Sequence, residues 1–150
     1  KEIIMNVAVL VDHYTTNDIV ISMSKLLNDG LDNKKINDAA VFCNSLGPVS
    51  HESKYPVFSC AEIWSFTGSV IATHVHNVQS ALSVGNKFSV GWPVKHGDSH
   101  ALDLIEVVSN KKVKVICKDE QSAKELKRLT GQNPDSIVDE FGTELLEAIK

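Results

Sequence analysis

The sequence predicts an α/β fold with three layers, built around a mainly parallel sheet of about six strands. Short apolar runs recur along the 150 residues, and helical patterns separate most of them. Each run is nearly continuous, which is typical of strands that are buried on both faces. Because helical connections between strands favour parallel pairing, we expect a single domain that spans residues 1–150.

The predicted strands are rich in Val, Ile, Phe and Ala. They cover residues 6–11, 39–43, 57–60, 69–73, 88–92 and 113–117. The stretch "NSLGPVSHESKYP", residues 44–56, has the periodicity of neither a strand nor a helix, so we expect a long loop there.

The helical patterns have recognisable starts and ends. In the first helix, Thr15, Thr16 and Asn17 are candidate N-caps, and Gly30 is the expected end. Its apolar stripe consists of Ile19, Val20, Met23, Leu26 and Leu27. The stretches "DSHALDLIEVVSN" and "DEQSAKELKRLTG" repeat this arrangement and predict two further helices.

Composition limits the class of function. The hydrophobic fraction of 43% is ordinary for a globular protein, and no stretch is apolar enough to cross a bilayer. A net charge of -4 disfavours binding to nucleic acid. Cys43, Cys60 and Cys117 have no metal-binding spacing and lie in predicted strands, so we expect buried thiols in a reducing cytoplasm.

Polar and aromatic residues gather where the predicted strands end. In a parallel Rossmann-like sheet, ligands bind beyond the carboxyl ends of the strands. The residues expected at this edge are Asp12, His13, Tyr14, Asn44, Ser45, Glu62, Trp64, His74, His76, Asn77, Lys95, His96 and Asp98, with Trp92 closing the fifth strand. They indicate either a binding crevice or merely the polar boundary at which buried strands reach solvent.

The stretch "GSVIATHVHNVQSAL" places His74 and His76 two residues apart. On a strand both imidazoles would face one side and could share a metal ion, with a third ligand from a neighbouring strand end. If the strand stops at Thr73, this geometry fails. We therefore assign no metal, and the pair remains a candidate for ligand binding or catalysis.

Phosphate-binding motifs are absent from the sequence. The first strand-to-helix turn reads "VDHYTTNDI", which contains neither GxGxxG nor GxxxxGK[ST]. GxSxG is also missing, so a serine nucleophile of that type is not indicated. We expect no cofactor.

Two segments resemble the N-terminal Rossmann-like half of glycosyltransferases with the two-domain GT-B architecture. They are "NVAVLVDHY" with its helix and "VKVICKDEQSAKELKRLTGQNPDSIVDEF". The combination is most similar to glycosyltransferase-like proteins of large tailed phages, which implies a host cytoplasmic location. The glycine-rich opening loop, the paired glutamates and a DxD motif of glycosyltransferases are missing, so the resemblance implies an acceptor-side domain without its own donor-binding half.

The resemblance implies His13 or His74 as a catalytic base, active only where a partner completes the site. Candidate ligand-binding residues are Asp12, Tyr14, Asn44, His76, Trp92 and His96. The expected partners are a sugar or sugar nucleotide, and a protein partner or second copy of the chain. Two alternatives remain: a non-catalytic interaction module, and a small metal enzyme that uses His74 and His76.

Overall fold

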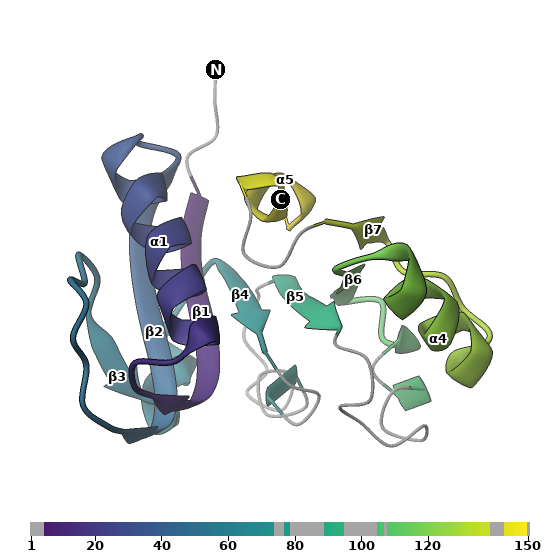
Figure 1. Cartoon of the computed structure of the whole chain (residues 1–150), viewed down its shortest axis with the longest axis horizontal. Helices are drawn as coiled ribbons and strands as arrows, with labels where there is room; N and C mark the ends of the chain where they lie inside the picture. The colour runs from purple at the N-terminus through teal and green to yellow at the C-terminus, as the bar shows by residue number, and fades with distance from the viewer. Residues whose placement is uncertain are drawn as a thin grey trace.

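The computed structural model describes residues 5–73, 77–78, 89–94, 105–106, 108–138 and 143–149, with only the backbone described for 89–94. It is a mixed α/β fold around a parallel sheet (Figure 1), which confirms the predicted α/β class and the mainly parallel pairing. The elements are β1 (Met5–Tyr14), α1 (Asp18–Asp32), β2 (Ile36–Leu46), β3 (Val57–Ser59), the 3₁₀ helix η1 (Cys60–Ser65), β4 (Ser69–Ala72), β5 (Ser89–Val94), β6 (Val113–Cys117), α4 (Glu120–Thr130), β7 (Ser136–Ile137) and α5 (Thr143–Ala148).

The strand order is β3-β2-β1-β4-β5-β6-β7, and every recorded pairing is parallel. From β1 the chain builds outward through β2 to β3. It then returns to the other side of β1 and continues from β4 to β7. The strand order therefore reverses between β1 and β4, which is where ligands bind in open parallel sheets.

Alternate residues of β1 face separate apolar clusters. Val7, Val9 and Val11 belong to a cluster that includes residues of α1 and α5, whereas Ala8 and Leu10 belong to one that includes residues of η1 and α4. This division is expected of a strand covered on both faces, because successive side chains point to opposite sides.

Helix α1 runs past the end that the sequence predicts. Asn17 is the N-cap, with its Oδ1 accepting a hydrogen bond from the Val20 N–H at 2.9 Å, as predicted. Gly30 is not the helix end: it is buried within α1, which continues to Asp32. A Cβ at Gly30 would lie 2.8 Å from Ile36 Cγ1, so glycine is needed here for close packing of α1 against β2.

Helix α4 matches its predicted bounds. Asp119 Oδ1 accepts a hydrogen bond from the Ser122 N–H at 2.7 Å, and Gly131 ends the helix with a φ of 77°. Within the described ranges, no helix combines the length and hydrophobicity that crossing a membrane requires.

Three sequence predictions need correction. β1 and β2 extend beyond their apolar runs, to Tyr14 and Leu46. Cys60 is the first residue of η1 rather than part of a strand, and it is half-buried. Ile105, which belongs to the inward-facing apolar stripe of the helix predicted from "DSHALDLIEVVSN", is exposed.

Candidate functional site: the crevice between β1 and β4

A crevice of about 170 Å³ lies where the strand order reverses. It is formed by the carboxyl end of β1, the first turn of α1 and the residue that follows β4. Its lining residues are Val11, Asp12, His13, Asn17, Ile19, Val20 and Thr73. The structure thus brings the predicted site residues Asp12 and His13 together with the N-cap of α1.

Asp12 and His13 are the last polar residues of β1, and each bonds to its neighbour on β2. Asn44 Nδ2 donates to Asp12 Oδ1 at 3.1 Å, and His13 Nδ1 lies 2.5 Å from Ser45 Oγ. Both pairs sit inside the parallel ladder rather than in a turn, which corrects the predicted end of β1. The ladder therefore fixes the backbone that carries these side chains.

Gly47 follows β2 and packs against His13. A Cβ on this glycine would lie 2.8 Å from Thr15 Oγ1 and 2.9 Å from His13 Nε2. The Gly47 N–H donates to the Tyr14 carbonyl at 2.9 Å, and Thr15 Oγ1 donates to the Pro48 carbonyl at 2.8 Å. These contacts hold the loop after β2 beside the crevice and leave no space for a larger residue.

Thr73 and Asn77 tie the end of β4 to β1. The Leu10 carbonyl accepts hydrogen bonds from Thr73 Oγ1 at 3.0 Å and from Asn77 Nδ2 at 3.4 Å. Both donors are buried, and Asn77 Nδ2 also lies 3.4 Å from Thr73 Oγ1. These side-chain bonds add to the backbone bond from the Thr73 N–H to the same carbonyl at 3.3 Å, and so they fix the position of Thr73 in the wall of the crevice.

Tyr14, a predicted ligand-binding residue, is not among the described lining residues of the crevice. Its side chain is buried among other hydroxyl groups: its OH lies 2.8 Å from the Tyr55 OH and 2.9 Å from Ser53 Oγ, and the Tyr55 OH also bonds to Ser24 Oγ. His51 Nε2 lies 3.1 Å from the same Tyr14 oxygen. This network fastens the loop before β3 to β1 and α1.

The remaining predicted residues are placed only in part. Asn44 lies beside the crevice through its bond to Asp12. The backbone of Trp92 belongs to β5. His74, His76 and His96 lie outside the described residues. In the part of the chain that the structure describes, no group of His, Cys, Asp and Glu is arranged to hold a metal ion.

The part of the crevice wall that the structure describes carries negative charge. Asp12 lines it and Asp18 stands in the first turn of α1, while no Lys or Arg is among the described lining residues. Burial raises the pKa of the Cys43 thiol, and it raises the pKa of Cys60 and of Cys117 to about 11. These thiols are protonated at neutral pH, so none of them is an activated nucleophile.

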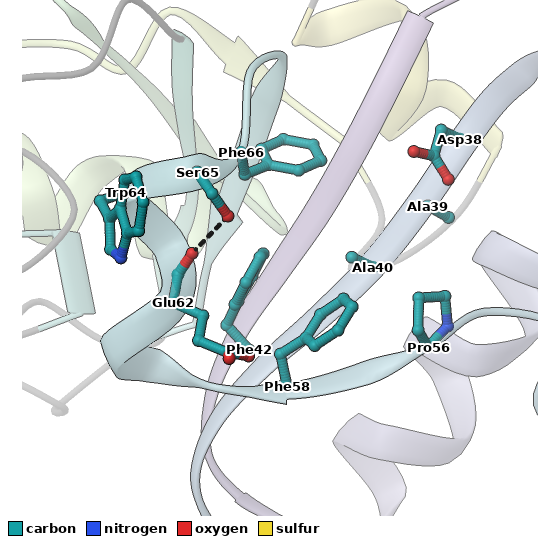
Figure 2. A pocket seen from close by; sticks show the side chains of 10 residues that line it. All are labelled: Asp38, Ala39, Ala40, Phe42, Pro56, Phe58, Glu62, Trp64, Ser65 and Phe66. Carbon is teal, nitrogen blue, oxygen red and sulfur yellow. Dashed lines mark hydrogen bonds between the residues drawn. The ribbon is translucent and has the colours of Figure 1, made fainter.

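A second, larger cavity was missed by sequence reasoning. It has a volume of about 320 Å³ and lies over β2 and β3, beneath η1 (Figure 2). Its aromatic walls come from Phe42, Phe58, Trp64 and Phe66. The available signal was the spacing of the aromatic residues in "FSCAEIWSF". The sequence pattern places Phe58 in a predicted strand and Trp64 at the edge beyond that strand, and so it does not group the two side chains.

No known protein family matches the sequence, no curated protein matches it, and no solved structure matches the fold.

Proposed function

We propose that this chain is the acceptor-binding half of a GT-B-like glycosyltransferase, with a three-layer Rossmann-like architecture. The crevice between β1 and β4 is its acceptor site. The observation that carries the proposal is a polar crevice at the point where the strand order reverses. The order β3-β2-β1-β4-β5-β6 is also the one expected of a Rossmann-like sheet.

The lining favours a neutral ligand that is rich in hydroxyl groups. Carboxylates accept hydrogen bonds from sugar hydroxyls, and imidazole, amide and hydroxyl groups can both donate hydrogen bonds to them and accept hydrogen bonds from them. The crevice offers one of each of these four groups, on Asp12, His13, Asn17 and Thr73 respectively. Without a Lys or Arg among these lining residues, the crevice suits an acceptor sugar better than the diphosphate of a donor. A second unit would supply the donor.

His13 is the proposed general base. For Nε2 to accept a proton from an acceptor hydroxyl, the neutral ring must carry its own proton on Nδ1. Ser45 Oγ, 2.5 Å from Nδ1, is placed to accept that N–H and to hold this tautomer. His74, the other predicted base, follows Thr73 directly in sequence and remains a prediction.

Saturation-transfer NMR with methyl glycosides and UDP-sugars tests the proposal. We expect some of the neutral glycosides to bind, and Asp12→Asn to weaken their binding several-fold because Asp12 loses its negative charge. Asp29→Asn is the matched control, since Asp29 is exposed near the other end of α1. Binding of UDP-sugars alone, or equal loss in both variants, would contradict an acceptor site in this crevice.

A protein-interaction module is the second candidate. It is favoured by apolar side chains that stand exposed at the end of β2 and in η1, with Leu46 and Trp64 each 68% exposed. Light scattering over a concentration series tests self-association, and Leu46→Ser is expected to reduce it. A monomer at all concentrations, with the same mass for the variant, would argue against association through this surface.

A further inference from the structure

The aromatic cavity over β2 and β3 exists because the connection from β3 to β4 is short. A parallel crossover normally carries a full α-helix that covers the sheet. Here η1, the six residues Cys60–Ser65, takes that place. Ile63 of η1 is buried against the core, but the helix is too short to cover the same face of β2 and β3.

The open part of this face is aromatic. Phe42 of β2 is buried and stacks on Phe58 of β3, with ring centroids 5.7 Å apart. Phe66 meets Phe42 edge-on at 5.9 Å. Phe58 is 40% exposed and Trp64 is 68% exposed, so aromatic surface is available to a ligand. The faces of such rings attract cations.

Carboxylates add negative charge to this cavity. Asp38 of β2 and Glu62 of η1 both line it, and Figure 2 shows them on opposite sides of the space. Neither Lys nor Arg occurs among its described lining residues. A ligand that enters would therefore meet π faces, the methyl group of Ala40, and negative charge.

We propose that this aromatic cavity binds a small organic cation, namely a substituted ammonium group on an apolar body. The alkyl groups of such a cation pack against Phe58 and Trp64, and its charge lies between Asp38 and Glu62. The volume of about 320 Å³ suits a small molecule. No lining residue is shared with the crevice between β1 and β4, so this site is independent of the proposed acceptor site.

Choline and its uncharged isostere 3,3-dimethylbutan-1-ol separate the effect of charge from the effect of shape. We expect choline to shift the amide NMR signals of Phe42, Phe58 and residues 62–66, with a dissociation constant on the order of 1 mM. The isostere should bind at least about fivefold more weakly. The signals of Asp12 and Asn17 should not move.

Variants identify the groups responsible. Glu62→Gln should weaken choline binding about two- to fivefold, and Trp64→Leu by a similar factor, because each removes one attractive group at an exposed position. Glu52→Gln, an exposed glutamate outside the cavity, should leave binding unchanged. Equal binding of choline and its isostere, unchanged binding in Glu62→Gln and Trp64→Leu, or no shift up to about 100 mM choline would each overturn the proposal.

Discussion

His13 and Gly47 set the geometry of the crevice at the scale of single residues. The imidazole is held between Ser45 Oγ on one side and the backbone of Gly47 on the other. The position of the His13 ring therefore depends on Gly47, which is not itself a lining residue of the crevice.

Gly47→Ala should displace His13. The added Cβ would lie 2.9 Å from His13 Nε2, so the ring must move, at a cost of about 1–3 kcal/mol in the free energy of unfolding. Chemical denaturation gives the cost, and the NMR signals of the imidazole report the movement.

Gly131→Ala is the control for this substitution. A Cβ there meets no atom within 4 Å, so its cost comes only from the positive φ of 77°. It should destabilise the fold without moving the His13 signals. An unmoved imidazole in Gly47→Ala would contradict the assigned packing.

Tyr55 belongs to a buried hydroxyl network whose stability depends on pH. Burial raises its pKa to about 12, above the ordinary value near 10. The folded state thus favours the neutral phenol. The neutral phenol therefore contributes to the free energy of unfolding. This contribution is fully present below about pH 10 and is lost as the pH rises towards 12.

Tyr55→Phe should flatten the alkaline part of the stability profile. The wild type should lose on the order of 2 kcal/mol more than the variant as the pH rises through this window. The raised pKa values of Cys60 and Cys117 act in the same window in both proteins, so the difference isolates Tyr55. Denaturation at stepwise pH measures it, and parallel profiles would be inconsistent with a perturbed Tyr55.

At the scale of elements, α1 links the stability of the fold to the crevice. Its N-cap, Asn17, also lines the crevice. A substitution at the start of this helix therefore affects both folding and the candidate site.

Asn17→Ala should cost about 1 kcal/mol in the free energy of unfolding, because the Val20 N–H loses its acceptor. Asn17→Ser should retain most of that stability, since serine is also a good N-cap. Asn33→Ala at the other end of α1 is the matched control, and it should change stability by less than about 0.5 kcal/mol. Urea denaturation measures the free energy of unfolding of each variant. Equal losses in Asn17→Ala and Asn33→Ala would contradict the capping role of Asn17.

The order of elements was predictable from the sequence, but several boundaries were not. Apolar runs located the strands because burial requires such side chains. The apolar runs end before β1 and β2 do, because the backbone hydrogen bonds of the sheet continue through polar residues such as Asp12 and Asn44. Gly30 has the sequence pattern of a helix end, although its small size serves packing against Ile36.

The candidate site was predictable only as an edge of the sheet. The end of the first apolar run placed Asp12 and His13 there, whereas the orientation of Tyr14 depends on Tyr55, 41 residues away in sequence. The aromatic residues of "FSCAEIWSF" were visible in the sequence, but the cavity that they line was not, because it results from a crossover shorter than the usual helix.

At the scale of the whole molecule, β1 is an interior strand of the sheet, between β2 and β4. Val9 pairs with Val41 of β2 on one side and with Ile71 of β4 on the other. By contrast, β3 and β7 stand at the edges and are only three and two residues long. Stability should therefore decrease from β1 outwards.

Hydrogen exchange should follow this gradient. We expect the slowest exchange at the amides of β1 between Val7 and Val11, and fast exchange in β3 and β7. Exchange measured by NMR at neutral pH checks this at single residues. Equal protection in β7 and β1 would indicate that the sheet order does not govern stability.

The central claim is that the crevice between β1 and β4 binds a neutral, hydroxyl-rich ligand. An amide NMR titration with the tightest-binding methyl glycoside tests it most directly, because it locates the ligand on the whole molecule. We expect shifts at Asp12, His13, Asn17 and Thr73, and none at Phe58 or Trp64. Shifts confined to the aromatic cavity, or saturable binding that leaves Asp12 and His13 unmoved, would contradict the claim.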